Sequence, residues 1–566
     1  MPDSKRLNLV LCWHMHQPEY RSLHDGRYRQ PWVYLHGIKD YVDMAAHIEA
    51  VPEARAVVNF SPVLLDQIQD YIDQIQAFLG GGGALRDTLL EALVGQFPAA
   101  VPERAALIES CLRANKTRVI ERFPVYQRLV GMAESVIKNP ELGGYFSDQY
   151  LWDLVVWYHL AWLGETVRRV DARLEPFIKQ GYGFDQDWGR RLLVILVELL
   201  AGLVPRYRKL AASGQVELSF TPYAHPIIPL MVDFSVARES QPDVVLPESA
   251  YYPDGAVRAR QQIRDGQAVF ADHFGFRPMG CWPAEGALSA QTLALLEDAG
   301  VRWTASGERV LRHTVEASGG AWREASRHRA YCEPDHKLSC FFRDDGLSDL
   351  IGFSYADWHA DDAIANLIER LENIAAATQD EPTTLVSIIM DGENAWEYYP
   401  ENGYYFLQAL YQRLTQHPII RLTTFSEYLH EGHDALPLPR LVAGSWVNGT
   451  LATWIGDPDK NRAWEVLVEA KATFDRVSAT GRLSDEQCAE AKRMLAICEG
   501  SDWCWWFGDY NPSASVAQFD ELYRLHIASL YIALGEAPPP SAQDVFTRPG
   551  VGWAQGGGVM RTSGAS

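Results

Sequence analysis

The chain has 566 residues, of which 47% are apolar and 22% charged, a composition that excludes disordered, collagen-like and coiled-coil proteins. Its length exceeds what one hydrophobic core supports, so more than one domain is expected. The net charge of −22 makes nucleic acid and anionic membranes poor partners, because an acidic surface repels phosphate groups.

Short apolar runs separated by helical stretches recur along the chain. A continuous apolar run is typical of a strand buried on both faces of a parallel sheet. The pattern predicts an α/β fold, a (β/α)7-type parallel barrel of seven or eight strands, with a doubly wound open sheet as the alternative. The predicted strands are residues 9–13, 56–60, 216–220, 279–282, 301–305, 338–342, 385–390 and 422–425.

Two regions interrupt this alternation. Residues 62–205 are rich in helical patterns and are interpreted as helical insertions within a catalytic α/β barrel over residues 1–430. Residues 431–536 are predicted as a C-terminal helical domain that completes the cleft. Asp457-Pro458 is typical of a helix start, and Ser484 with Gln487 predicts a capping box. We expect a flexible tail over 537–566.

The N-terminus predicts neither export nor membrane insertion. Its apolar run is too short for a signal peptide, and the chain lacks about 18 consecutive apolar residues. The eight cysteines contain no C-x-x-C pair, and several lie in apolar, strand-like runs. They are interpreted as buried free thiols of a reducing compartment, so a cytoplasmic protein is expected.

A histidine pair, His14 and His16, follows the first predicted strand. Positions i and i+2 of extended backbone point to the same side, so both imidazoles can share one face at the strand end. Three interpretations stay open for the motif alone: packing or capping histidines, a zinc-binding pair, or hydrogen-bonding groups for a polar ligand.

Two acidic motifs also follow predicted strands. Glu285 stands after Trp282-Pro283, which provide an apolar wall, although an acid in a first helical turn is ordinarily a surface residue. Asp391 ends another apolar run and is followed by Gly392-Glu393, where a single helix-capping acid is the simpler interpretation. The second motif lacks the full acidic spacing of a calcium loop.

Together these acids fit glycoside hydrolysis. That reaction uses two carboxyl groups, one with a raised pKa, and a separation of about 5 Å gives retention of configuration. A parallel barrel brings the carboxyl ends of its strands together, so Glu285 and Asp391 can lie close in space although they are 106 positions apart in the sequence. Motifs of serine hydrolases, P-loop proteins and dinucleotide-binding proteins are absent from the sequence.

The motif set resembles glycoside hydrolase family 57, a retaining α-glucan-active family. The matching segments occur in the family's order and extend over nearly the whole chain. They are residues 14–18, 214–218, 223–226, 282–286, 390–394, 444–456 and 461–464. The resemblance implies a (β/α)7 barrel with a helical C-terminal region that completes the cleft.

The resemblance also assigns roles at the site. It implies Glu285 as nucleophile and Asp391 as general acid/base, with no cofactor and no metal. The implied substrate-binding residues are His14, His16 and His225 for sugar hydroxyls, Trp282, Trp396, Trp446 and Trp454 as stacking faces, and Glu217 and Glu393 as secondary candidates. Arg343, beside three acids, is expected either to hold a catalytic carboxylate or to belong to a surface charge cluster.

The motif forms resemble those of α-amylase and amylopullulanase-type members, with starch, glycogen or maltooligosaccharides as the implied partner. A 4-α-glucanotransferase or branching enzyme acting through the same acids is the alternative. Two rival classes remain: a metal-dependent sugar hydrolase that uses the three histidines, and a non-catalytic glucan-binding protein. The metal-dependent hydrolase is expected to lose activity when a chelator removes its zinc. The glucan-binding protein is expected to bind starch without releasing reducing ends.

Overall fold

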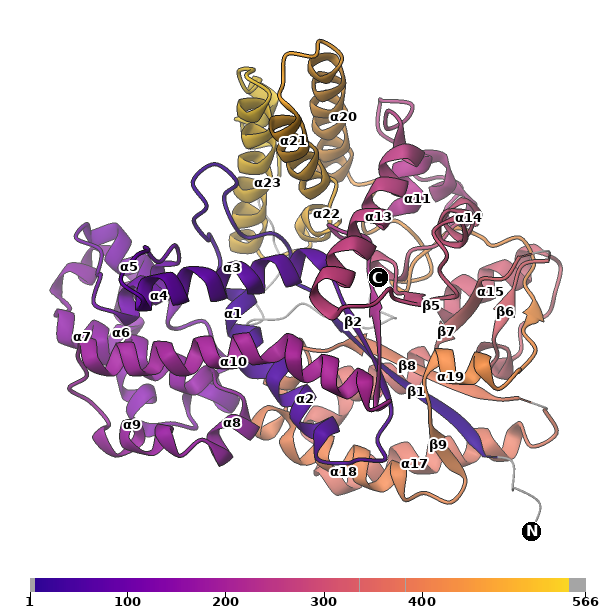
Figure 1. Cartoon of the computed structure of the whole chain (residues 1–566), viewed down its shortest axis with the longest axis horizontal. Coiled ribbons are helices and arrows are strands. Elements are labelled where there is room, and N and C mark those ends of the chain that lie inside the picture. The colour runs from indigo at the N-terminus through magenta and orange to yellow at the C-terminus, as the bar shows by residue number, and fades with distance from the viewer. Residues whose placement is uncertain (1–5, 335, 382, 549–566) are drawn as a thin grey trace.

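A computed structural model describes residues 6–334, 336–381 and 383–548 of the chain (Figure 1). Its centre is a curled sheet with the strand order β10-β6-β7-β5-β4-β3-β2-β1-β8. Every pairing along the run from β7 to β8 is parallel. The predicted seven-stranded parallel architecture is therefore confirmed. Its strands are β1 (Leu7–Met15), β2 (Ala56–Phe60), β3 (Val216–Phe220), β4 (Gly280–Cys281), β5 (Trp303–Gly307), β7 (Ser339–Arg343) and β8 (Leu385–Asp391).

The eighth predicted strand, residues 422–425, was wrong: the observed strand lies earlier in the chain and is not part of the main run of the sheet. Strand β9 (Ile420–Leu422) pairs only with the first residues of β1 and lies off the main run. The chain then turns into helix α19 (Phe425–His430), because Thr424 and Glu427 form a capping box. Two strands of two residues each, β6 (Tyr331–Cys332) and β10 (Leu436–Pro437), were not predicted.

The two ends of the parallel run meet at β7 and β8. The backbone N–H of Asp344 donates to the carbonyl of Ser387 at 2.8 Å, and Arg343 Nε donates to the carbonyl of Ile389 at 2.7 Å. Antiparallel β6 pairs with the first half of β7, at Ser339 and Cys340, so the second half is left to face β8. These bonds close the curl and bring all seven carboxyl ends to one rim.

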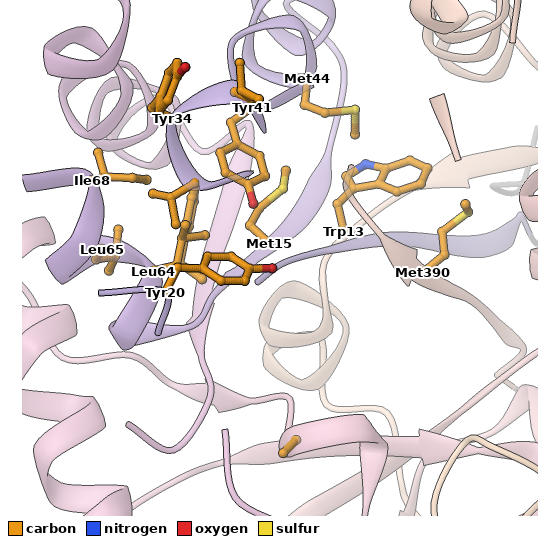
Figure 2. Close-up of a cluster of buried hydrophobic side chains, with 14 of the residues drawn as sticks. Trp13, Met15, Tyr20, Tyr34, Tyr41, Met44, Leu64, Leu65, Ile68 and Met390 are labelled. Atoms are coloured by element: carbon orange, nitrogen blue, oxygen red, sulfur yellow. The ribbon is translucent and has the colours of Figure 1, made fainter. Parts of the chain in front are cut away.

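Residue parity along β1 divides the core into two layers. Odd-numbered residues such as Trp13 and Met15 contact the surrounding helices, and Figure 2 shows them beside Tyr41 and Met44. Even-numbered Val10 and Cys12 belong to a second cluster inside the curled sheet. Because side chains alternate across a strand, His14 also points to the inside, one step before the rim.

Helices surround the sheet, and α4 to α9 lie toward one end of the long axis (Figure 1). The first half contains α1 (Trp32–His36), α2 (Val42–Glu49), α3 (Pro62–Leu79), α4 (Thr88–Leu93), α5 (Val101–Ser110), α6 (Pro124–Lys138), α7 (Asp148–Trp162), α8 (Glu165–Val170), α9 (Glu175–Gln180) and α10 (Gln186–Ala212). Next come α11 (Ile228–Val232), α12 (Ala237–Ser240), α13 (Gly255–Phe274), α14 (Ala290–Asp298), α15 (Glu308–Ala317), α16 (Asp345–Asp349), α17 (Ala360–Ala377) and α18 (Tyr404–Thr415).

The C-terminal region is helical, as predicted. It contains α20 (Pro458–Ser478), α21 (Asp485–Cys498), α22 (Asp502–Trp506) and α23 (Ser513–Ala533). Both predicted helix starts are confirmed: Asp457 caps α20 with Pro458 in its first turn, and Ser484 with Gln487 forms the capping box of α21. No helix among the described residues is long and apolar enough to cross a membrane. All eight cysteines are free.

The flexible tail predicted over 537–566 stays a prediction. Residues 549–566 lie outside the described part of the chain, whereas residues up to Arg548 contact the C-terminal helices. Arg548 pairs with Asp457 and Asp459 near the start of α20, and Phe546 packs edge-on against Phe507.

A buried carboxylate joins the C-terminal region to the barrel. Glu499, directly after α21, accepts hydrogen bonds from Arg258 Nε at 2.6 Å and Nη2 at 3.0 Å. Tyr252 Oη and Gln262 Nε2 donate to it at 2.6 and 2.7 Å. A buried carboxylate needs such partners, because desolvation of an unpaired charge is very unfavourable.

We expect Glu499→Ala to lower the free energy of unfolding by about 3–5 kcal/mol, because Arg258 is left buried without its counter-charge. The midpoint of urea denaturation, followed by circular dichroism, measures the effect. Glu490→Ala, at an exposed position of the same helix, is the matched control and is expected to change stability by less than about 0.5 kcal/mol. Equal midpoints for the two variants would contradict the assigned role of Glu499.

Candidate active site

A cavity of about 420 Å³ lies at the rim formed by the strand ends. It is lined by residues from the strand ends, from the segment after β1, from the end of α5, and from the C-terminal helices. Six predicted site residues are among them: His14, His16, Glu285, Asp391, Glu393 and Trp446. The cavity therefore collects both predicted catalytic acids.

Glu285 lies in a strained turn directly after β4. Its backbone adopts φ 57° and ψ 24°, a left-handed conformation that is unfavourable for residues with a side chain. The next residue, Gly286, also has positive φ, and a Cβ there would lie 2.8 Å from the ring of Trp282. The turn presents the Glu285 side chain, which is partly exposed, to the cavity.

Trp446 holds the Glu285 carboxylate in place. Its indole Nε1–H donates to Glu285 Oε2 at 2.9 Å, and its backbone N–H donates to the Glu285 carbonyl at 3.1 Å. The Trp446 ring also lies over the Arg343 guanidinium, 5.5 Å from its centroid. A carboxylate held by such contacts has little conformational freedom left to lose.

Asp391 is the last residue of β8, paired in register with His14 of β1. Burial is the largest influence on its carboxyl group and raises its pKa. The Asn394 Nδ2–H, which donates to Asp391 Oδ2 at 2.9 Å, acts in the opposite direction, as do the charges of His16 and Arg343. Burial is therefore the main cause of the raised pKa of Asp391.

Glu393 lies on the cavity wall but is almost fully buried. Its Oε1 accepts from the backbone N–H of His16 at 3.3 Å and from Gln17 Nε2 at 3.2 Å. Burial, and then the nearby charges of Asp391 and Asp40, raise its pKa well above the ordinary value. A protonated Glu393 can hold the segment after β1 against the end of β8.

The three predicted histidines form one hydrogen-bonded stack. The amide oxygen of Asn59 lies 2.7 Å from His14 Nδ1, which assigns the proton to that nitrogen. His14 Nε2 then accepts from His225 Nε2 at 3.2 Å, and His225 Nδ1 accepts from Ser501 Oγ at 2.9 Å. Burial lowers the pKa of His14 to about 3 and that of His225 well below its ordinary value, so both are neutral.

His16 joins this stack from the cavity side. Its ring lies 3.7 Å from that of His225, with an angle of 14° between the planes. Its Nε2 lies 2.9 Å from Asp502 Oδ1 and its Nδ1 lies 2.8 Å from Ser61 Oγ. His225 itself is fully buried behind His14 and His16 and supports them rather than lining the cavity.

The metal-binding alternative finds limited support in this geometry. One nitrogen each of His14, His16 and His225 lies within 4.8 Å of the others, close enough for a shared ion. The His16 ring, however, stacks face to face on that of His225 with 14° between the planes, so the in-plane lone pairs of these two rings run side by side instead of converging on one point. Each imidazole already has hydrogen-bond partners for both nitrogens.

Three of the four predicted stacking tryptophans do not reach the cavity. Trp282, Trp396 and Trp454 have at most 1% of their surface exposed, so no face is left for a sugar ring. Trp282 packs edge-on behind Trp446, with centroids 5.0 Å apart. Trp396 donates to the carbonyl of Gly392 at 2.8 Å and so supports the turn after Asp391. Of these four predicted tryptophans, Trp446 alone lines the cavity.

Glu217 also lies away from the cavity, inside the curled sheet. It accepts from Trp303 Nε1 at 2.6 Å and from the backbone N–H of Ser426 at 2.9 Å, in the first turn of α19. It therefore fixes α19 against the inside of the sheet near the start of β3, at the strand end opposite the rim, where it is partly exposed and away from the cavity.

Arg343 lines the cavity, but the carboxylates it holds are not the two predicted catalytic ones. Its Nη1 donates to Asp345 at 2.7 Å and its Nη2 to Asp349 at 2.8 Å, in addition to its bond to the backbone of β8. Because Arg343 is 7% exposed, the alternative of a surface charge cluster was also wrong.

Several lining residues were missed from the sequence. The largest are Trp32, Phe353, Trp505, Trp506 and Phe519, and Asp502 contacts His16. The run from Ser501 to Trp506 contains an acid and three tryptophans in six residues. This density of sugar-binding residue types could have marked the run as part of the site. Gln17 and Asn394 belong to motifs already identified.

The comparisons with known proteins agree with this arrangement. Residues 10–438 match the sequence model of glycosyl hydrolase family 57. The chain belongs to this family. A comparison with curated proteins gave no match.

Solved structures of the same fold include a family 57-type branching enzyme from Pyrococcus horikoshii, 15% identical, with 93% of this chain and 88% of that chain covered and a TM-score of 0.59. The α-amylase AmyC from Thermotoga maritima is 13% identical, with 95% and 96% covered and a TM-score of 0.56. The 4-α-glucanotransferase from Thermococcus litoralis is 15% identical, with 93% and 60% covered and a TM-score of 0.50.

The histidine geometry generates a prediction about metal. We expect dialysis of the purified chain against a chelator to leave its activity within twofold, because hydrogen bonds already use the histidine nitrogens. Elemental analysis before dialysis gives the matching measurement, with less than about 0.1 zinc per chain expected. Stoichiometric zinc, together with loss of activity on chelation and recovery with added zinc, would favour the metal-dependent class instead.

Proposed function

We propose that the protein is a retaining α-glucan-active glycoside hydrolase that cleaves α-1,4-glucosidic bonds, with Glu285 as nucleophile and Asp391 as general acid/base. One observation carries the proposal. The ends of β4 and β8 present these two carboxyl groups to the same cavity, one fixed by an indole N–H and the other with a pKa raised by burial. This asymmetry is what double displacement requires.

In the first step, the ionised Glu285 carboxylate attacks the anomeric carbon and the glycosidic C–O bond breaks. Asp391 gives its proton to the leaving oxygen, so the departing chain leaves as a neutral alcohol. The raised pKa of Asp391 keeps that proton available at higher pH. Trp446 holds Glu285 for the attack.

In the second step, Asp391 is ionised and accepts a proton from water, whose oxygen attacks the anomeric carbon and releases Glu285. The Asn394 amide and the positive charge of Arg343 favour this ionised form of Asp391. The opposing influences on the carboxyl group, burial on one side and these two groups on the other, therefore suit its two roles.

Of the predicted sugar-binding groups, those on the cavity wall are kept in the proposal. His14 and His16 offer ring edges and faces, Glu393 a carboxyl group, and Trp446 an indole face. An α-glucan such as starch, glycogen or a maltooligosaccharide fits this set, because sugar rings present apolar C–H faces and a border of hydroxyl groups.

The hydrolase assignment is tested by incubation with soluble starch, pullulan and glycogen, following reducing ends and branch content together. Release of reducing ends supports hydrolysis, and attack on pullulan extends it to α-1,6 bonds. Redistributed chain lengths or added branches without new reducing ends would instead indicate transfer through the same two acids. No change in any of the three substrates would overturn the proposal.

We expect Glu285→Gln and Asp391→Asn each to lower kcat on starch by about 10³-fold or more, because each removes a group that acts on the reacting bond. Asp391→Asn is expected to lose less activity on an aryl maltoside with a good leaving group, since that group departs without a proton. Initial rates on both substrates measure this.

Asp357→Asn, a similar change at an exposed carboxylate, is the matched control and should keep wild-type rates. If both catalytic variants kept more than a tenth of wild-type activity, the assignment of the two acids would be wrong.

We also expect Asn394→Leu to move the alkaline limb of the kcat/KM profile to higher pH. The Asn394 amide stabilises ionised Asp391 and so lowers the pKa of that carboxyl group. Without the amide, the pKa rises further and Asp391 keeps its proton to higher pH. Asn366→Leu, on the outer helix α17, is the control. A limb that stays in place or moves to lower pH would contradict the role of Asp391 as the acid.

A further inference from the structure

Two tryptophans of the C-terminal region line the cavity and have no part in the mechanism above. Trp505 and Trp506 end helix α22, and both are partly exposed. We call this pair the Trp505–Trp506 platform. A large aromatic surface left partly exposed in an active-site cavity is unfavourable unless a ligand covers it.

The platform is held rigidly. The Trp506 ring stacks on Phe519 of α23, with centroids 4.7 Å apart and 13° between the planes. The Asn511 amide donates to the carbonyls of Trp505 at 3.0 Å and of Trp506 at 2.8 Å, which fixes the turn after α22. A rigid aromatic face binds with little loss of side-chain entropy.

The start of the same helix is bonded to the histidine stack. Asp502 contacts His16 at 2.9 Å, and Ser501 bonds to His225 through both its backbone N–H and its hydroxyl, at 2.9 Å each. The backbone N–H of His16 in turn donates to Glu393, two residues after Asp391. The platform is thus fixed in place relative to the catalytic acid.

Polar side chains from three separate regions line the same cavity as the platform, and one of them, Gln518, precedes in α23 the Phe519 on which Trp506 stacks. Gln30 Nε2 donates to Gln518 Oε1 at 3.1 Å, and Arg113 Nη1 donates to Gln30 Oε1 at 3.2 Å. All three residues line the cavity. Amide and guanidinium groups next to an aromatic face form the combination that a sugar ring requires, since its hydroxyls are polar and its C–H faces apolar.

We propose that the Trp505–Trp506 platform, with Gln30, Arg113 and Gln518 at its border, is a glucosyl-binding subsite separate from the catalytic residues. It takes a further glucose unit of the same α-glucan chain whose scissile bond lies at Glu285 and Asp391. The inference rests on the function proposed above and deepens it, because such a subsite favours long chains over short ones. The continuity of one cavity from the acids to the platform identifies the occupant as the same chain.

Isothermal titration of maltoheptaose and maltotriose into the full chain carrying Asp391→Asn tests the subsite without turnover. Adding Trp505→Ala or Trp506→Ala is expected to weaken maltoheptaose binding by about tenfold and maltotriose binding by less than twofold. Trp506→Phe keeps an aromatic face and should recover most of the affinity. Trp358→Ala, at a tryptophan that is 45% exposed and lies outside the cavity lining, is the matched control.

Each result decides between the two proposals. Unchanged maltoheptaose affinity in both alanine variants would overturn the subsite and leave the proposed function intact. Equal losses for both sugars would also overturn it, since they would mean that the tryptophans support the catalytic end through Asp502 and His16. If the parent Asp391→Asn chain bound neither sugar, the proposed function would fail and the subsite with it.

Discussion

The buried guanidinium of Arg343 is the interaction on which the geometry of the site depends. It occupies the junction where β7 and β8 meet, bonded to a backbone carbonyl of β8 and to two carboxylates. Removing this charge from water is tolerable only because all these acceptors surround it. The Trp446 ring lies over the same group and holds Glu285, while Asp391 follows two residues after the bonded carbonyl. Both candidate catalytic acids are therefore positioned through one side chain.

A second connection joins the site to the C-terminal helices, through contacts between residues 241 to 486 positions apart. Ser501 and Asp502 bind the histidines that follow β1 and β3, while Glu499 binds Arg258 of α13. The C-terminal helices thus form one wall of the cavity, held by polar contacts at two points. This explains why a family match that ends at residue 438 leaves out part of the cavity wall.

The parity of residues along each strand made part of the site predictable. Val10, Cys12 and His14 share one face, and so do Ile389 and Asp391, so the buried apolar run itself indicated which polar residue reaches the rim. The tryptophans had no such periodic signal. Trp282 and Trp396 occur in motifs beside the acids, yet the chain uses them as packing behind the turns that present Glu285 and Asp391, and Trp454 is buried next to Trp464.

The sequence by itself determined the seven strands of the parallel run, two helix starts and the order of the motifs, because each depends on residues close together in the chain. It also determined which acids follow the strands β4 and β8. Only the tertiary structure decided which aromatic faces stay open, that Glu217 lies inside the sheet, and that Trp505 and Trp506 meet the histidine cluster. Those outcomes depend on how segments hundreds of residues apart pack against one another, and the residue types alone do not encode that packing.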